Sequence, residues 1–324
     1  MLPTPPQPDL LIVIVNYRTP AMTIDCLHAL LPELQSMPEN ARVVVVDNGS
    51  ADGSADAIHR AIIDHHWQPT CELLPLDHNL GFAGGNNRGI ACYPDARYVL
   101  LLNSDTLMHP GTLRHCLDLM HARTDIGALA CRLLSADGSP QTMARRFPTP
   151  LRHTLVALGL PWWLPRWFAH FDPEYISTDH HHHPREVDWL GGAFLLLRGE
   201  ALQAVGQLDE DFFFYGEDIE LCHRLHRHHY TRYYDPRVTI THFGGASADE
   251  NHHHAPRQNP AYWHARYLVQ RKCFGRLAAA WLRILDLLSL SLRLIVMRAR
   301  GLARSQRYQR DAAAWRLLRK PLST

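Results

Sequence analysis

The stretch Tyr98-Val-Leu-Leu-Leu-Asn-Ser-Asp105 carries the clearest structural signal in the chain. Its first five residues have almost no polar content and predict a buried β-strand. The strand runs without a glycine or proline into the polar residues Asn103, Ser104 and Asp105. In an open α/β sheet, ligands bind at the carboxyl ends of the strands, so Asp105 is expected over a ligand crevice. A carboxylate there suits Mg²⁺ or Mn²⁺; the alternative is that Asp105 caps a helix beginning near Pro110.

Three further apolar runs precede this stretch and alternate with predicted helices. They are Leu10–Val15, Arg42–Val46 and Cys71–Leu76. Strands and helices that alternate at a spacing of about 30 residues are typical of a parallel sheet built from right-handed βαβ units. The helix after the first strand is expected to stop or kink near Leu31, because Pro32 follows. The predicted fold class is therefore α/β, with a mostly parallel, doubly wound sheet.

Polar side chains and glycines follow these strands. Asn16 and Tyr17 come after the first strand and Asp47 after the second, which predicts that they lie over the same sheet edge as Asp105. Segment 79–89 follows the third strand, and its glycines are Gly81, Gly84, Gly85 and Gly89. Such a segment allows close backbone approach to a ligand and the start of a helix whose free N–H groups suit phosphate, or it simply makes a tight turn. It is neither GxGxxG nor GxxxxGK[ST], which disfavours a Rossmann dehydrogenase and a P-loop ATPase.

Size and composition are those of an ordinary globular protein. The 324 residues, 46% of them hydrophobic, suit one large domain with an appendage, or two domains. The balance of 33 basic and 32 acidic side chains gives no reason to expect a nucleic-acid partner. Seven scattered cysteines without a CxxC motif indicate a reduced, cytoplasmic protein. Residues 1–9 are proline-rich and lack a signal peptide, so we expect a disordered lead.

The regular alternation breaks between residues 146 and 184, after a predicted strand at Ala128–Leu134. This stretch contains six prolines and three tryptophans and shows little periodicity, so we expect a mobile insertion beside the site. It includes the run Asp179-His-His-His-His183. Contiguous histidines in a loop point in several directions, which favours a solvated or pH-sensitive loop over a metal site.

Regular structure resumes near Val187, where two glycines and an apolar run predict a bend followed by a strand. Further on, apolar residues at helical spacing predict a helix that starts near Glu217, with Glu217 and Asp218 in its first turn. The aromatic run 212–215 would place these carboxylates in a poorly hydrated environment. Such an environment raises a carboxylate pKa and suits a general base, although acidic residues in a first turn also simply favour the helix dipole. A last predicted strand, Val238–Thr241, ends in a residue that can bind metal, His242.

Seven motifs in this order resemble one known family. They are Val15-Asn16-Tyr17, Asp47-Asn48-Gly49-Ser50, Asn79-Leu80-Gly81-Phe82-Ala83-Gly84-Gly85-Asn86, Asn103-Ser104-Asp105, Trp189-Leu190-Gly191-Gly192-Ala193, Glu217-Asp218 and His242. They are similar to motifs of the inverting glycosyltransferases of family 2, in the rhamnosyltransferase-like group. The resemblance covers about Leu10 to Gly245. It implies the nucleotide-sugar-binding GT-A fold over residues 10–258, with a helical, basic extension at residues 259–324.

The resemblance also implies roles for individual residues. The residues implied to bind the donor nucleotide are Asn16, Tyr17, Asp47, Gly84, Gly85, Asn87, Asn103 and Ser104. Those implied on the sugar and acceptor side are Trp189, Gly191 and Gly192. The family's Asp-x-Asp element has Asn103 in its first position here, which leaves Asp105 as the carboxylate on the metal. His242 would be the second protein ligand of Mg²⁺ or Mn²⁺.

The implied chemistry is inverting transfer of a sugar from a nucleotide donor. The cation assists departure of the nucleoside diphosphate, and a carboxylate removes the proton of an acceptor hydroxyl. Asp218 is the expected base, since Glu217 precedes it on the helix and cannot point the same way. The nearest relatives suggest dTDP-L-rhamnose as donor, with UDP-linked sugars left open. The expected acceptor is a glycan or lipid-linked sugar used in cell-surface polysaccharide synthesis.

The C-terminal region is basic, with fourteen Lys or Arg against two Asp from Arg266 onward. The apolar run 281–297 contains three charged residues, which argues against a membrane span. Segment 277–310 is therefore expected either to contact a membrane surface, making the protein peripheral on the inner face of the membrane, or to pack on the catalytic domain or a second copy.

Two other function classes fit the fold. A non-catalytic nucleotide- or carbohydrate-binding scaffold would be favoured had Asp105, Asp218 or His242 been absent, but all three are present. A nucleotidyltransferase would be expected to carry a basic, glycine-rich loop directly after the first strand. Here Asn16-Tyr17-Arg18-Thr19-Pro20 follows instead.

Overall fold

The computed structural model describes residues 7–160, 164, 182–244 and 260–319. Its described residues form two compact units. The first comprises residues 7–145, 182–213 and 217–244, and the second comprises residues 146–160, 164, 214–216 and 260–319. Residues 1–6, the first part of the predicted disordered lead, lie outside the described residues. The same holds for Asp179 to His181, the first part of the histidine run noted in the sequence.

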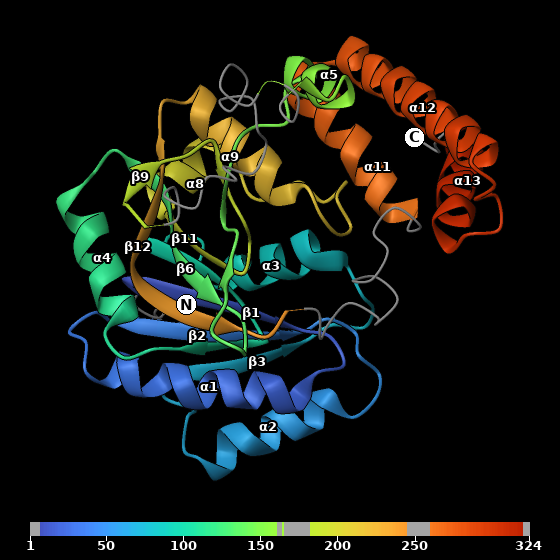
Figure 1. The fold of residues 1–324 in the computed structure, drawn as a ribbon. Coiled ribbons are helices and arrows are strands. Elements are labelled where there is room, and N and C mark those ends of the chain that lie inside the picture. The colour runs from blue at the N-terminus through green and yellow to red at the C-terminus, as the bar shows by residue number, and fades with distance from the viewer. Residues whose placement is uncertain (1–6, 161–163, 165–181, 245–259, 320–324) are drawn as a thin grey trace. The chain divides into compact units, whose positions relative to one another are not determined.

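The first unit is built on a mixed sheet whose strands and helices alternate along the chain (Figure 1). Its strands are β1 Leu10–Asn16, β2 Ala41–Asp47, β3 Cys71–Pro75, β4 Tyr98–Asn103, β5 Thr106–Met108, β6 Ile126–Leu134, β7 Pro140–Gln141, β9 Arg185–Glu186, β11 Phe194–Arg198 and β12 Thr231–His242. A separate two-stranded ladder pairs β8 Ala144–Arg145 with β10 Trp189–Leu190. The helices of the first unit are α1 Pro20–Gln35, α2 Ser54–Asp64, α3 Gly81–Cys92, α4 Thr112–Ala122, α8 Gly199–Val205 and α9 Glu217–Arg227.

The strand order confirms the predicted fold class. The path through the main sheet is β3-β2-β1-β4-β11-β6-β12-β5, and neighbouring pairs among β1 to β4 are parallel, as are β6 and β12. Strand β11 lies antiparallel between β4 and β6. Alternate residues of a strand face opposite sides, and all of Leu10 to Ile14 is fully buried. Helices therefore cover both faces of the central strands, which is why these strands read as continuous apolar runs.

Helix α1 does not stop at Pro32, which is one of the two predicted outcomes, but continues past it to Gln35. A proline inside a helix removes one backbone hydrogen bond and costs about 3 kcal/mol. The helix buries side chains on both sides of this point, among them Leu27, Leu31 and Leu34. Their burial, worth about 1.5 to 3 kcal/mol for each leucine, outweighs the cost of the proline.

The glycine-rich segment starts a helix, as predicted, and α3 begins at Gly81. The stretch Gly84–Asn87, which the resemblance implies to be a loop against the nucleoside, lies within this helix instead. A Cβ on Gly85 would lie 3.0 Å from the Val15 side chain, and one on Gly89 would lie 2.4 Å from that of Val13. The glycines thus allow α3 to pack directly against β1, and this packing overrides their poor helix propensity.

The second unit is helical. It contains α5 Pro150–Ala157, α11 Pro260–Val269, the π-helical turn η4 Gln270–Phe274, α12 Arg276–Ala299 and α13 Gln306–Arg319. Residues 146–160, predicted as part of a mobile insertion, belong to this unit, in which Thr154 accepts a hydrogen bond from the Trp281 indole at 2.9 Å. None of the helices in the described part of the chain has the length and apolarity that a membrane crossing requires.

Candidate active site

Three strand ends meet at one edge of the sheet in the first unit. The parallel register places Asn16 at the end of β1 beside Asp47 at the end of β2. On the other side of β1, Asn103 at the end of β4 pairs with Val15. Because these strands run parallel, their carboxyl ends lie at the same edge of the sheet, as expected from the sequence.

Asp47 is held in a buried hydrogen-bond network. Its carboxylate accepts from Asn16 Nδ2 at 2.6 Å and from Ser50 Oγ at 2.6 Å. Asn16 Oδ1 in turn accepts from Thr23 Oγ1 at 2.9 Å. The Asn16 amide is therefore engaged by the chain itself and orients Asp47. A direct contact of Asn16 with a nucleoside stays a prediction.

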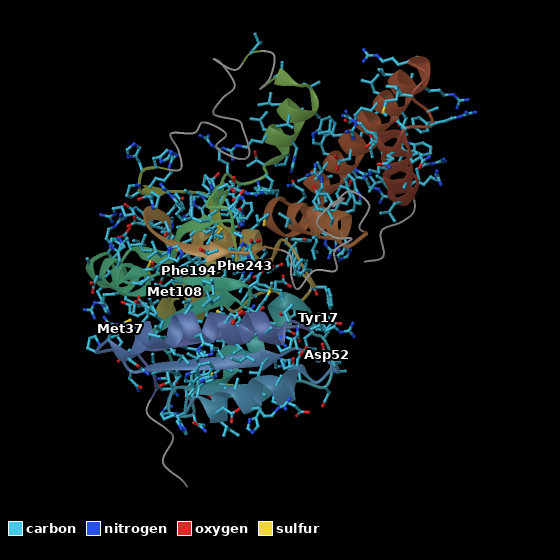
Figure 2. The ribbon with its side chains drawn as sticks, turned by 60° about the horizontal axis from the view of Figure 1, so that its bottom comes forward. Tyr17, Met37, Asp52, Met108, Phe194 and Phe243 are labelled. Atoms are coloured by element: carbon cyan, nitrogen blue, oxygen red, sulfur yellow. The ribbon has the colours of Figure 1, made fainter. Side chains whose placement is uncertain are left out.

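Tyr17 and Asn48 shape the entrance to this edge. Tyr17 is partly exposed, and the guanidinium of Arg18 lies 5.1 Å from the centre of its ring. Figure 2 shows Tyr17, which follows β1, on the same side of the molecule as Asp52, which follows β2. The buried Asn48 amide donates to Gly81 O at 2.9 Å and accepts from Leu80 N at 3.0 Å, so it fixes the start of α3.

Asp105, His242 and Asn103 come together from distant parts of the sequence. His242 Nε2 lies 3.4 Å from Asp105 Oδ1 and 3.3 Å from Asn103 Nδ2. Backbone pairing supports this arrangement, because Phe243 N donates to Asp105 O at 2.9 Å. Asp105 is followed by strand β5 and does not start a helix, and α4 begins only at Thr112, so the helix-cap alternative is wrong.

Gln141 fixes the orientation of the His242 ring. Its Nε2 donates to the backbone O of His242 at 2.8 Å, and this bond sets which end of the amide faces the ring. Its Oε1 then lies 2.7 Å from His242 Nδ1 and accepts a hydrogen bond from it. Nε2 is consequently the nitrogen that carries no proton and offers its lone pair. Asn103 Nδ2, which lies 3.3 Å away, can donate a hydrogen bond to it.

The donor set fits a hard divalent cation. Cis ligands at 2.0–2.1 Å from an octahedral ion lie about 3 Å apart, close to the observed Asp105–His242 distance of 3.4 Å. Within the residues that the structure describes, no group of three or more His, Cys, Asp or Glu side chains gathers. A cation held by Asp105 and His242 would take its remaining ligands from diphosphate oxygens and water, as Mg²⁺ typically does.

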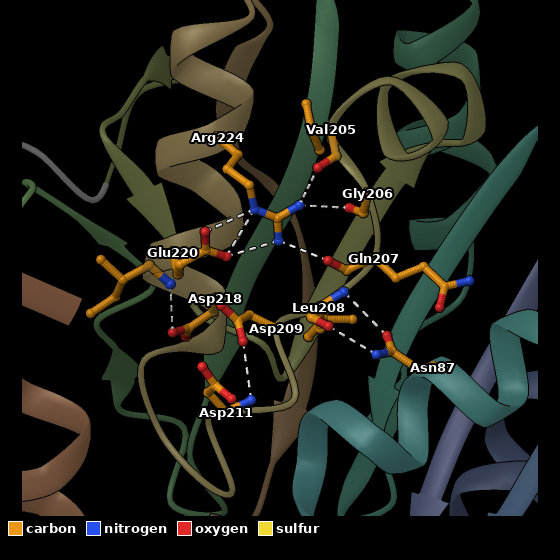
Figure 3. A network of polar contacts seen from close by, with 11 residues as sticks. Asn87, Val205, Gly206, Gln207, Leu208, Asp209, Asp211, Asp218, Glu220 and Arg224 are labelled. Atoms are coloured by element: carbon orange, nitrogen blue, oxygen red, sulfur yellow. Dashed lines mark hydrogen bonds and ion pairs between the residues drawn. The ribbon is translucent and has the colours of Figure 1, made fainter. Parts of the chain in front are cut away.

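Asn87 and Ser104 are both buried. The Asn87 amide donates to Leu208 O at 2.8 Å and accepts from Leu208 N at 3.1 Å (Figure 3). It thereby ties α3 to the segment that leads into α9. Ser104 Oγ lies 3.5 Å from Thr19 Oγ1. Both side chains are engaged within the protein, and their contact with a donor stays a prediction.

Helix α9 begins at Glu217, as predicted, and Arg224 anchors it. The Arg224 guanidinium binds Glu220 on the same helix at 2.8 Å and the backbone oxygens of the preceding segment, including Gly206 and Gln207 at 2.8 and 2.7 Å (Figure 3). These bonds tie α9 to the end of α8. The expected aromatic wall is incomplete, because Phe212 is buried whereas Phe213 is 55% exposed.

Asp218 lies next to the residues predicted for the sugar and acceptor side. Its carboxylate accepts hydrogen bonds from the backbone N–H groups of Ile219 and Gly192, and the charge of Arg145 acts on it. Arg145 in turn lies 5.4 Å from the centre of the Trp189 ring. The neighbouring Gly191 donates its N–H to Met143 O at 3.2 Å.

The two carboxylates at the start of α9 differ in surroundings. Burial raises the pKa of both, and the charge of Asp218 raises the pKa of Glu217 further. Three backbone N–H groups, those of Ile219, Asp218 and Gly192, and the charge of Arg145 oppose the rise of the Asp218 pKa, whereas Glu217 Oε2 has no hydrogen-bond partner among the described residues. Glu217 is 6% exposed, and Asp218 is partly exposed. The pKa of Asp218 is thus raised less than that of Glu217, and the Asp218 side chain is the more exposed of the two.

Several functional side chains have no signal in the sequence. Gln141 lies 101 residues from His242, and Arg145 has no motif around it. Both belong to the irregular region after β6, which periodicity does not resolve. Ser50 and Asn48 belong to a motif that the sequence analysis identified, but their hydrogen bonds depend on the fold. Ser50 donates to Asp47, and Asn48 binds the start of α3.

Comparison with known proteins decides the family. A profile described as "Glycosyltransferase like family 2" matches residues 6–261, which is most of the chain. The chain belongs to glycosyltransferase family 2.

Family 2 relatives with known names include rhamnosyltransferases. The chain is 31% identical to the N-acetylglucosaminyl-diphospho-decaprenol L-rhamnosyltransferase of Mycobacterium tuberculosis over 212 residues, which are 62% of this chain and 66% of that enzyme. It is 25% identical to rhamnosyltransferase WbbL of Escherichia coli over 266 residues, covering 76% of this chain and 89% of WbbL.

Solved structures show the same GT-A fold. A mannosyltransferase from Pyrobaculum calidifontis, solved in complex with GDP-Man and Mn²⁺, superposes with a TM-score of 0.54 at 15% identity, over 96% of this chain and 85% of that one. GalNAc-T7, solved with UDP, GalNAc and Mn²⁺, gives a TM-score of 0.58 at 11% identity, over 82% and 48% of the two chains.

Proposed function

We propose that this chain is a metal-dependent inverting glycosyltransferase that transfers L-rhamnose from dTDP-L-rhamnose to a lipid-linked glycan acceptor. The convergence of Asp105, Asn103 and His242 at the strand ends that also carry Asp47 is the observation that supports it most. The names of the mycobacterial and Escherichia coli relatives support rhamnose, and the mycobacterial name supports a diphospholipid acceptor. We also propose that the enzyme works at a membrane surface, through residues 277–310.

Asp105 and His242 would hold Mg²⁺ or Mn²⁺, and Gln141 would keep His242 Nε2 available for it. When bound, the cation neutralises the negative charge that develops on the departing nucleoside diphosphate. Asp47 would accept a hydrogen bond from the pyrimidine or ribose, with Tyr17 beside the ring. The nucleotide would thus lie at the carboxyl ends of β1 and β2, and the acceptor would lie at the start of α9.

Asp218 would accept the proton of the acceptor hydroxyl as the oxygen attacks the anomeric carbon. The proton moves to the Asp218 carboxylate, the new C–O bond forms on one face of the sugar, and the bond to the diphosphate breaks on the other. Its raised pKa brings Asp218 closer to the pH at which it works, which improves general-base catalysis. Glu217, buried with an even less favourable environment for charge, would stay protonated.

The test is transfer by the full chain with Mn²⁺, dTDP-L-rhamnose and a synthetic N-acetylglucosaminyl-diphospholipid. We expect a disaccharide product of inverted anomeric configuration by NMR, and loss of transfer when EDTA is added. UDP-glucose and GDP-mannose are the donor controls. Equal transfer from a control donor would overturn the assignment of rhamnose. Absence of transfer from every donor, together with absence of nucleotide binding, would favour the non-catalytic scaffold.

A further inference from the structure

Helix α12 has one face packed inside the second unit. Leu282 and Leu290 are buried there in a cluster with Trp263, Tyr267 and Leu318. The cluster joins α11, α12 and α13, so one side of α12 is already occupied.

The three charges that interrupt the apolar run of α12 all have partners within this unit. Asp286 binds Arg266 Nε at 3.0 Å and accepts from the Tyr267 hydroxyl at 2.9 Å. Arg283 donates to Leu318 O at 2.7 Å, and Arg293 forms an ion pair with Asp311 at 3.7 Å. The charges that argued against a membrane span in the linear sequence therefore lie on the packed side of the helix.

The opposite side of α12 carries an apolar stripe, in which the Trp281 indole also donates to Thr154 Oγ1 of α5 at 2.9 Å. Its residues recur at intervals of three or four, which places them on one helix face, and each is 44% to 87% exposed. They are Leu277, Trp281, Ile284, Leu288, Leu292 and Ile295. At 1.5 Å per residue the stripe is about 27 Å long. Apolar side chains scattered singly on a surface are ordinary, but a continuous stripe marks an interaction site.

Exposed basic residues stand at both ends of the stripe. Arg271, Lys272 and Arg276 precede it, and Arg298, Arg300 and Arg304 follow it. Between residues 260 and 319 there are thirteen Lys or Arg and two acidic residues, Asp286 and Asp311, both engaged in the contacts described above. The outward charge of this unit is thus strongly positive.

We propose that this stripe lies flat on an anionic lipid surface, with the apolar side chains in the headgroup–acyl boundary and the basic ends on lipid phosphates. Apolar burial combined with attraction to anionic lipids is the physical basis of interfacial helices. A second copy of the chain fits less well, because stripe-to-stripe pairing in either direction brings a basic end against a basic end. The inference deepens the proposed function, since it places a family 2 enzyme where a lipid-linked acceptor resides.

The experiment is co-sedimentation of the full chain with vesicles of phosphatidylcholine alone and of phosphatidylcholine mixed with phosphatidylglycerol. We expect binding to the anionic vesicles that weakens as salt is raised, and at least tenfold weaker partitioning for Leu288→Asp. Ile63→Asp is the matched control, because Ile63 is 44% exposed on α2 in the first unit. The same change of charge there should leave partitioning unchanged.

Equal binding by wild type and Leu288→Asp, or no binding to anionic vesicles at low salt, would overturn the proposal. So would a dimer in sedimentation that Leu288→Asp dissociates, because the stripe would then cover a second copy. A thermal shift with dTDP and Mn²⁺ is measured on the same samples and should be unchanged by Leu288→Asp. If the wild-type chain shows the thermal shift but does not bind anionic vesicles, the lipid surface alone is refuted. If the wild-type chain binds vesicles but shows no thermal shift, the proposed function alone is refuted.

Discussion

Replacing Gln141 by leucine should weaken metal binding without unfolding the protein. The substitution removes the acceptor that faces His242 Nδ1 at 2.7 Å and the donor to the His242 backbone O at 2.8 Å. Without them the imidazole is free to rotate and to carry its proton on Nε2, the nitrogen that must offer its lone pair to the ion. Partners that orient a ligating histidine typically contribute about 10- to 100-fold in metal affinity, which corresponds to about 1.4 to 2.7 kcal/mol.

The assay is Mn²⁺ binding in the presence of dTDP, followed by electron paramagnetic resonance of the free ion. Ser135→Ala is the matched control, since it removes the bond that Gln141 Nε2 donates to Ser135 Oγ at 3.1 Å but keeps both bonds to His242. Its Mn²⁺ affinity should stay within about twofold of wild type, well inside the range that outer partners contribute. Equal affinity in Gln141→Leu and wild type, with the melting temperature preserved, would refute the reasoning about the ring orientation.

Three other substitutions test other parts of the account. Asp218→Asn should lower kcat by about 10²- to 10⁴-fold with little change in donor dissociation constant, and a residual rate above about a tenth of wild type would contradict its role as base. Burial raises the pKa of Glu217 above its unfolded value, so its ionisation costs stability as pH rises; Glu217→Gln should therefore raise the melting temperature more at pH 8 than at pH 5, and a pH-independent difference would argue against it. Gly89→Ala should destabilise the protein by about 1 to 3 kcal/mol in urea unfolding, because its Cβ would lie 2.4 Å from Val13 Cγ1, and the added Val13→Ala should recover part of that loss if the clash is the cause.

The fold was predictable from the sequence wherever local pattern and tertiary environment agree. Strand β4 is buried on both faces, so the run from Tyr98 to Leu102 carries its whole signal within itself. The parallel register then brings Asn16 beside Asp47 without further information. The helical spacing after Glu217 likewise matched α9.

Prediction failed where long-range packing reverses a local preference. Pro32 is tolerated in α1 because the helix buries leucines on both sides of it. The glycines of α3 form a helix because only residues without a Cβ let it approach β1 so closely. Gln141 depends on a partner 101 residues away, which no local pattern records. The sequence likewise does not predict that Asp286 lies on the packed side of α12, because this depends on its ion pair with Arg266 on another helix.

Metal-dependent donor binding is the most direct test of the central claim that Asp105 and His242 complete a nucleotide-sugar site. The measurement is the thermal shift of the full chain with dTDP, UDP and GDP, each with and without Mn²⁺. A ligand at a hundredfold excess over its dissociation constant stabilises by about 2.7 kcal/mol. The account predicts a shift with dTDP that requires Mn²⁺ and is lost in Asp105→Asn. Absence of a shift with every nucleotide, or a dTDP shift that is equal without metal and in Asp105→Asn, would contradict it.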